Sequence, residues 1–138
     1  MEEQFETKRL IIRPMGEQDA EFLLELLNSP KWLQYIGDRN VHSLDEARAY
    51  IRSRVISQHE RLGFSNFMVI RKKDGSKIGC CSLVDRDGLD EIDIGFAFLP
   101  QYERMGYAFE STSLVKEIAL RLYKIPSLSA ITIQENIA

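Results

Sequence analysis

A glycine-containing loop that joins a strand pattern to a helix pattern is the part of this sequence best suited to chemistry. Before the loop, Glu91–Leu99 alternates apolar residues with small or polar ones, as an extended strand does. After it, apolar residues recur at helical spacing from about Tyr107. Gly106 falls where that helix would begin, so the backbone N–H groups of the loop and of the first helical turn would point at one spot. The arrangement predicts a binding site for an anion, with phosphate as the usual ligand.

Two carboxylates precede this loop. In the alternating strand, Asp93 shares a face with Gly95 and Ala97, whose small side chains leave room for a ligand. Glu91 lies on the same face, farther from the loop. A carboxylate beside a bound substrate can take a proton from it, which makes Asp93 and Glu91 the candidate catalytic bases. The pattern equally permits a second interpretation, in which both carboxylates only keep the edge of the sheet soluble.

The loop lacks two other phosphate-binding motifs. It has neither G-x-x-x-x-G-K-[ST] nor G-x-G-x-x-G, which excludes a nucleoside-triphosphatase loop and a dinucleotide-binding turn. Its sequence, E-R-M-G-Y-A at Glu103–Ala108, resembles the pyrophosphate loop of the GNAT acetyltransferases, which follows the pattern Gln/Arg-x-x-Gly-x-Gly/Ala. Gly106 and Ala108 match this pattern, whereas Glu103 stands where the family has Gln or Arg.

The N-terminal stretch F-E-T-K-R-L-I-I-R-P-M, followed by a helix pattern, narrows the resemblance. It is similar to the start of the GNAT branch that acetylates the N termini of ribosomal proteins, the RimJ/RimL-like enzymes. The resemblance implies an N-acetyltransferase that moves an acetyl group from acetyl-CoA to a primary amine, either a protein N-terminal α-amine or a small amine, without a metal. The alternative is a CoA-binding fragment or pseudoenzyme with impaired catalysis.

The resemblance also implies roles for particular residues. In the family, the pantetheine arm of CoA pairs with an exposed strand edge, and the pyrophosphate binds the amides of the loop. Trp32 and Tyr35 lie in a region that helps to wall the acceptor site, although aromatic residues between helices equally often cover the edge of a core. The implied cofactor-binding residues are Phe96, Ala97, Phe98, Leu99, Glu103, Arg104, Met105, Gly106, Tyr107, Ala108 and Asn136.

The elements that would position these residues alternate along the whole chain. A capping box, S-x-x-E at Ser43, predicts the start of one helix, and an Asp-Gly pair at Asp74 predicts a hairpin. The expected fold is α+β, a GNAT fold with a mixed, mostly antiparallel twisted sheet flanked by helices, in which the last two strands are parallel. The expected strands are Thr7–Arg13, Phe64–Arg71, Lys77–Val84, Glu91–Leu99 and Leu128–Ile133, and the expected helices are Glu17–Leu27, Ser43 to about Arg61, and Tyr107 to about Tyr123 with Leu114, Val115, Ile118, Ala119 and Leu122 as its apolar face.

Composition limits the other possibilities. The 138 residues suffice for one domain over 1–138, and a net charge of −3 gives no basic face for nucleic acid. No apolar run approaches the ~20 residues that cross a membrane, and the acidic start does not resemble a signal peptide, so we expect a cytoplasmic protein. Cys80 and Cys81 are neighbours that would point to opposite faces of a strand, so we expect two reduced thiols, one of them in the core, and no metal site.

The resemblance implies a longer fold than these residues supply. In the family, a motif like Glu135–Ala138 is followed by a further helix and two strands, so we expect a GNAT fold truncated at its C-terminal end. An unpaired sheet edge invites another chain. We therefore expect that a homodimer could cover it.

Overall fold

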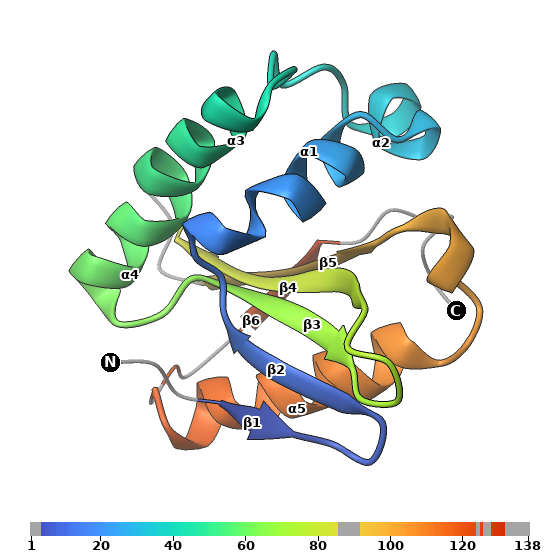
Figure 1. The fold of residues 1–138 in the computed structure, drawn as a ribbon. Coiled ribbons are helices and arrows are strands. Elements are labelled where there is room, and N and C mark those ends of the chain that lie inside the picture. The colour runs from blue at the N-terminus through green and yellow to red at the C-terminus, as the bar shows by residue number, and fades with distance from the viewer. Residues whose placement is uncertain (1–3, 86–91, 124, 126–127, 132–138) are drawn as a thin grey trace.

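The structure is a computed structural model that describes residues 4–85, 92–123, 125 and 128–131. Its centre is a six-stranded sheet whose strands lie side by side in chain order (Figure 1). The first five strands are antiparallel, and the sixth runs parallel to the fifth. The predicted mixed, mostly antiparallel sheet is therefore confirmed. The strands are β1 (Phe5–Glu6), β2 (Leu10–Pro14), β3 (Asn66–Arg71), β4 (Lys77–Asp85), β5 (Ile92–Phe98) and β6 (Leu128–Ile131).

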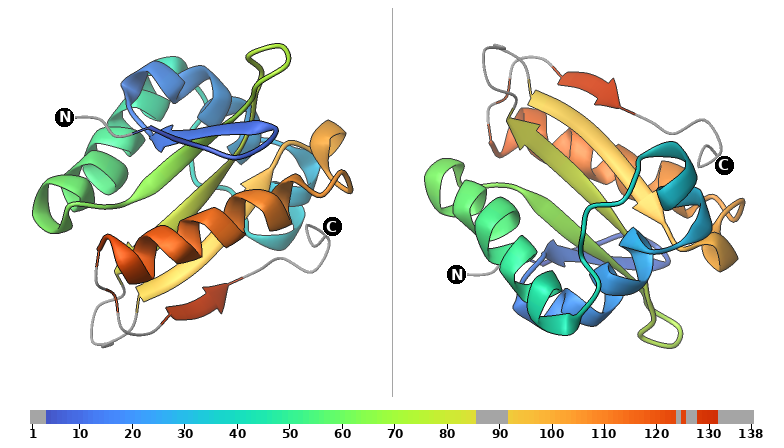
Figure 2. Two further views of the ribbon diagram at one scale, coloured as in Figure 1. Left: turned by 90° about the horizontal axis from the view of Figure 1, so that it is seen from below. Right: turned by 90° about the horizontal axis from the view of Figure 1, so that it is seen from above.

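Helices cover both faces of this sheet. One face carries α1 (Ala20–Leu27), α2 (Pro30–Tyr35), α3 (Leu44–Tyr50) and α4 (Ser57–Leu62), and the other carries α5 (Tyr107–Arg121). Figure 2 shows α5 in front of the sheet from below and the other helices in front of it from above. A short 3₁₀ turn, Glu17–Asp19, leads into α1, and a second one, Pro100–Tyr102, follows β5.

Each face of the sheet packs into its own apolar core, as the alternation along β5 predicts. Ile94 and Phe98 of β5 pack toward α5, and Ala97 and Leu99 pack toward α1 and α3. Cys81 belongs to the first core and Cys80 to the second, and both are free and buried. The prediction of two reduced thiols on opposite faces is confirmed. The expectation that only one lies in a core is wrong, because helices cover the sheet on both sides.

The predicted helix from Ser43 begins as expected but is not regular. Ser43 Oγ accepts a hydrogen bond from the Glu46 N–H at 3.1 Å, and Glu46 Oε1 accepts one from the His42 N–H. The helix ends at Gly63, whose φ of +89° is readily available only to glycine. Between α3 and α4, however, Ile51–Ile56 forms a π-helical turn, so the prediction of one continuous α-helix is wrong in its middle.

The N-terminal strand is also shorter than predicted. Thr7–Arg9 forms the turn between β1 and β2, with the Thr7 N–H donating to the Leu10 carbonyl at 2.9 Å. A long-range contact explains why these residues form a turn: Glu110 of α5 accepts hydrogen bonds from Thr7 Oγ1 and from the Arg9 N–H, which stabilise the turn.

The helix α5 is also shorter than predicted. It ends at Arg121 rather than at Tyr123, and Leu122 is 49% exposed instead of joining the core.

A buried carboxylate joins α1 to the sheet. Asp19 is fully buried, and its two oxygens accept hydrogen bonds from the guanidinium of Arg13 at 2.8 and 2.9 Å. Lys77 Nζ lies 2.7 Å from Oδ1, and the Gly16 N–H donates to Oδ2. Burial alone would raise the pKa of Asp19, but the hydrogen bonds from Arg13, Lys77 and Gly16 outweigh it and hold the pKa below its usual value.

Asp19→Asn should lower the free energy of unfolding by about 3 kcal/mol, because it leaves two cations without their shared partner. Since the folded pKa of Asp19 is depressed, its contribution is present above its unfolded pKa of about 3.9 and is lost as pH falls through the folded value. Urea unfolding at pH 7 and in a series from pH 5 to 2.5 measures both effects. Asp45→Asn, at an exposed ion pair with Arg48, is the matched control. Equal stability of the two variants would contradict this role of Asp19.

Candidate active site

A pocket of about 280 Å³ lies between the sheet and the helices α1 and α2. Its floor is formed by β4 and β5, and its wall by apolar side chains of the helices. Ligand pockets typically combine such an apolar lining with a few polar groups. The polar side chains that line this one are Arg39, Asn66, Ser82 and Asp93, and its apolar lining includes Leu23, Leu26, Leu27, Trp32 and Ile36.

Asp93 is the acidic side chain of this pocket. It is only 4% exposed, and it lines the pocket together with Gly95 and Ala97, as the predicted strand face requires. Trp32 also lines the pocket, whereas Tyr35 is 48% exposed and is not among the lining residues. Glu91, the second candidate base, lies outside the described residues. The structure thus brings Asp93 and Trp32 to one cavity.

The strand β5 continues beyond the last described residue of its parallel partner β6. β6 pairs with β5 from Ile92 to Gly95 only, and the described part of β6 ends there while β5 continues to Phe98. Both views of Figure 2 show β6 beside the first half of β5, with both strands running in the same direction. The side chains of Phe98 and Leu99 are buried in the cores, so main-chain groups are what they can offer to a ligand. Asn136 lies outside the described residues.

The predicted anion loop follows β5 after the short turn Pro100–Tyr102. Arg104 and Gly106 both adopt positive φ, +65° and +80°, which turns the chain sharply into α5. The Glu110 N–H donates to the carbonyl of Gly106 at 3.1 Å and is the first intrahelical donor, so the N–H groups of Tyr107, Ala108 and Phe109 have no acceptor within the helix. The side chains of Tyr107 and Ala108 are buried, which leaves their amides as the groups that can bind a ligand. Met105 and Arg104 are exposed, and Glu103 pairs with Lys31 of α2.

A clamp from the N-terminal hairpin holds this loop in place. Arg9 donates from Nε to Glu110 Oε1 at 2.7 Å and from Nη1 to the Met105 carbonyl at 3.0 Å, and its guanidinium lies 4.4 Å from the centre of the Tyr107 ring. Burial pushes the pKa of Glu110 up, but the hydrogen bonds from Thr7 and Arg9 outweigh it and keep the pKa below its usual value. Sequence reasoning missed this clamp, because no local pattern links positions 9 and 110.

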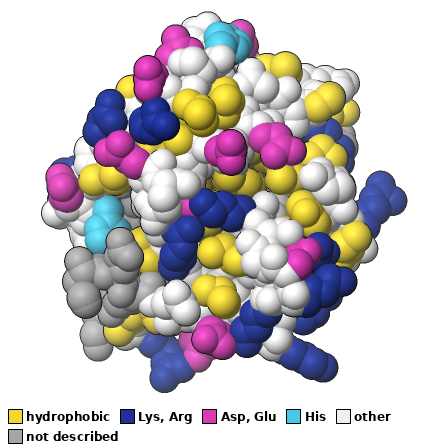
Figure 3. Space-filling model, in the orientation of Figure 1, with side chains coloured by type: hydrophobic (Ala, Val, Ile, Leu, Met, Phe, Trp, Pro, Cys, Tyr) yellow, Lys and Arg dark blue, Asp and Glu magenta, His cyan; other side chains and the backbone are white. Residues whose placement is uncertain are grey.

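Further cations lie near the loop. Arg71 stacks on the ring of Tyr102, 5.0 Å from its centre, just before the loop begins. Lys8, Lys72 and Lys73 are exposed in the neighbouring turns. Figure 3 shows Lys and Arg side chains gathered at the lower right, over the turns that join β1 to β2 and β3 to β4 in Figure 1. These charges favour an anion at this end of the molecule, although the net charge of the chain is −3.

Two other types of chemistry find little support at this site. Cys80 borders the pocket, but burial raises the pKa of its thiol to about 12, and that of Cys81 to about 11, so both thiols stay protonated at neutral pH. Among the residues that the structure describes, no group of three or more His, Cys, Asp or Glu side chains is placed to hold a metal ion.

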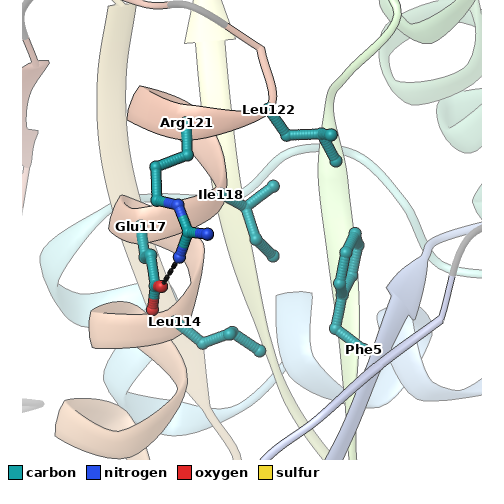
Figure 4. A pocket seen from close by; sticks show the side chains of 6 residues that line it. All are labelled: Phe5, Leu114, Glu117, Ile118, Arg121 and Leu122. Atoms are coloured by element: carbon teal, nitrogen blue, oxygen red, sulfur yellow. Dashed lines mark hydrogen bonds and ion pairs between the residues drawn. The ribbon is translucent and has the colours of Figure 1, made fainter.

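A second pocket, of about 350 Å³, lies between α5 and the strand β1 (Figure 4). Phe5, Leu114, Ile118 and Leu122 line it, and Glu117 and Arg121 at its rim pair with each other. Its polar groups are therefore already matched. It offers an apolar hollow without the carboxylate or the amides that distinguish the first pocket and the loop.

Comparison with known proteins identifies the family. The family model described as an acetyltransferase (GNAT) domain matches residues 9–138. The chain belongs to the GNAT acetyltransferase family. It is 26% identical over 135 residues to an uncharacterized N-acetyltransferase, YoaA, of Bacillus subtilis (strain 168). The alignment covers 95% of this chain and 74% of that protein. Like its family, this GNAT chain is an acetyl-transferring enzyme, and the family takes the acetyl group from acetyl-CoA.

Solved structures confirm the GNAT fold. RimL, a ribosomal L7/L12 α-N-protein acetyltransferase in complex with coenzyme A, matches with a TM-score of 0.78 at 19% identity, over 93% of this chain and 73% of that chain. A ribosomal-protein-S5-alanine acetyltransferase from Vibrio fischeri matches with a TM-score of 0.76 at 13% identity, also over 93% and 73%. In the described part of this chain, no helix is long and apolar enough to span a membrane.

The clamp can be tested by removing its carboxylate. Glu110→Ala should lower the free energy of unfolding by about 2 kcal/mol and speed amide hydrogen exchange in the turn Thr7–Arg9, because several charge-assisted hydrogen bonds are lost together. Glu117→Ala, which breaks the exposed pair with Arg121 on the same helix, is the control and should cost much less. Similar losses in both variants would show that Glu110 does not hold the hairpin.

Proposed function

We propose that this GNAT enzyme binds acetyl-CoA along the C-terminal end of β5 and the loop Glu103–Ala108, and transfers the acetyl group to a primary amine held in the pocket beside Asp93. The observation that carries the proposal is the single strand that supplies both sites. Asp93 lines the pocket, and the same strand leads to the loop within a few residues. Donor and acceptor would therefore meet on one rigid element, and transfer depends above all on such positioning.

The loop fits a pyrophosphate in three respects. The first N–H groups of α5 have no acceptor within the helix, Gly106 has no Cβ to fill the turn that its φ of +80° makes, and Arg9 and Arg71 lie beside the loop. The main chain of Phe96–Leu99, beyond the last described pair with β6, would bind the amides of the pantetheine arm. When bound, acetyl-CoA would supply a thioester, whose C–S bond breaks as the C–N bond to the amine forms, and CoA would leave as the thiol, taking up the proton that the attacking nitrogen loses.

The pocket fits an amine with an apolar neighbour. An amine is protonated at neutral pH and must lose a proton before it can attack a thioester, and Asp93, at the floor of the pocket, would accept that proton directly or through water. Trp32 and the leucines of α1 would hold the apolar part of the acceptor. The Leu99 N–H donates to the Ile78 carbonyl at 3.0 Å, so the main-chain N–H of Phe98 is the group that would polarise the thioester carbonyl.

For the acceptor we propose an N-terminal α-amine of a protein, with a small amine as the second candidate. The proposal rests on the similarity of the N-terminal sequence to the ribosomal-protein acetyltransferases and on the size of the pocket, which suits one side chain and an amine. A homodimer that would cover the outer edge of β6 stays a prediction. Turnover with a panel of peptides and amines would separate this function from a CoA-binding protein without activity.

The CoA site is tested at Gly106. Gly106→Val should weaken CoA binding at least tenfold, because valine is strained at a φ of +80° and its Cβ would lie 3.2 Å from Arg9 Nη2. Gly63→Val introduces the same kind of strain at a φ of +89°, far along the chain at the end of α4. It should cost similar stability and leave CoA affinity unchanged. Calorimetric titrations that give equal affinities for wild type and Gly106→Val would remove the proposed site.

The role of Asp93 is tested by an isosteric change. Asp93→Asn keeps the shape of the side chain and removes its basicity, so we expect the rate of acetyl transfer near neutral pH to fall by about 10²- to 10⁴-fold while CoA affinity is retained. Asp45→Asn, on the exposed side of α3, serves as the control. An unchanged rate in Asp93→Asn would mean that another group takes the proton.

A further inference from the structure

One carboxylate of the loop is turned away from solvent. Glu103 follows the turn Pro100–Tyr102, and its side chain is only 9% exposed. Its Oε1 accepts a hydrogen bond from Lys31 Nζ at 2.6 Å. Its Oε2 is buried and has no hydrogen-bond partner in the part of the chain that the structure describes. Within the described ranges, Lys31 is therefore the cation that balances the charge of Glu103.

This carboxylate occupies an unfavourable position for a phosphate site. Glu103 is the first residue of the loop whose amides we assign to the pyrophosphate. A bare carboxylate at that position would repel the phosphates, and the repulsion would be felt strongly because the side chain is shielded from water and counterions. The ammonium that cancels it comes from another element, α2, 72 residues earlier in the chain.

We propose that Lys31 is a positioning residue for CoA binding, whose ammonium neutralises Glu103 and thereby makes the loop Glu103–Ala108 able to accept the pyrophosphate. The inference rests on the proposed CoA site. It accounts for the acidic residue at the first position of the loop, where the GNAT pattern has Gln or Arg. Here the compensating charge is supplied from outside the loop.

The same contact joins the donor side of the site to the acceptor side. Lys31 lies in α2 next to Trp32, and Trp32 lines the acceptor pocket. Trp32 Nε1 is buried and has no hydrogen-bond partner among the described residues, so the ring is held by packing and by its place in α2. The Lys31–Glu103 pair fixes this short helix, and the pocket wall that it carries, to the CoA loop. Occupancy of the loop is thus coupled to the position of Trp32.

A double-mutant cycle tests the proposal. Calorimetry would measure CoA affinity in wild type, Lys31→Gln, Glu103→Gln and the double variant. Lys31→Gln should weaken binding by about tenfold, since it leaves the Glu103 charge bare beside the phosphates. Glu103→Gln should bind at least as tightly as wild type. The double variant should return to within about threefold of wild type, because no uncompensated charge remains.

Two controls separate the possible outcomes. Lys116→Gln removes the same charge from an exposed position of α5 and should leave affinity unchanged, and thermal unfolding of each variant checks that it is folded. The only tryptophan of the chain, Trp32, reports the coupling: CoA should change its fluorescence in wild type and not in the double variant.

Absence of CoA binding in wild type would remove the proposed CoA site itself. Normal binding in wild type with unchanged affinity in Lys31→Gln, or a double variant as weak as Lys31→Gln, would leave that site in place and overturn the role of Lys31. A fluorescence change that persists in the double variant would overturn the coupling to Trp32.

Discussion

The site depends on one strand that is packed on both faces and whose described pairing at one edge covers only its first half. β5 pairs with β4 along its whole length, from Ile92 to Phe98, whereas its described pairing with β6 ends at Gly95. Packing against α5 on one face and against α1 and α3 on the other makes the strand rigid. A rigid strand whose main-chain groups near the C-terminal end lie beyond its described pairing with β6 could hold a ligand without rearranging, which is the physical basis for proposing a donor and an acceptor on it.

Carboxylates that are partly or fully buried between elements fix the parts that surround this strand. Asp19 joins α1 to β2 and β4, Glu110 joins α5 to the N-terminal hairpin, and Glu103 joins the loop to α2. In each case the carboxylate and its cation lie on different elements. Such pairs add little net stability compared with apolar packing, but they allow only one arrangement of the elements that they join, because any other arrangement would leave a charge without its partner. The walls of the pocket and the shape of the loop follow from these three contacts.

The two sides of the proposed site differ in how they bind. On the donor side, the amides of the loop and the edge of β5 belong to the backbone, so many sequences can form them. On the acceptor side, the pocket is shaped by side chains of α1, α2 and the segment around Arg39. Differences among GNAT enzymes in what they acetylate are therefore expected to lie in these helices rather than in the loop, in keeping with the general rule that function depends on the site and not on the fold.

The sequence alone predicted what short-range patterns determine. The alternation in β5 predicted its two faces, with Asp93, Gly95 and Ala97 together on the pocket side, and Gly106 marked the start of α5, because strand alternation, helical spacing and positive φ depend on neighbouring residues. The tertiary structure decided the rest. The turn at Thr7–Arg9, the burial of both cysteines, and the ion pairs of Glu110 and Glu103 join residues far apart in the chain, and the π-helical turn within the helix after Ser43 left no signal in the local pattern. Such contacts are set by which elements pack together, and no spacing in the sequence records that choice.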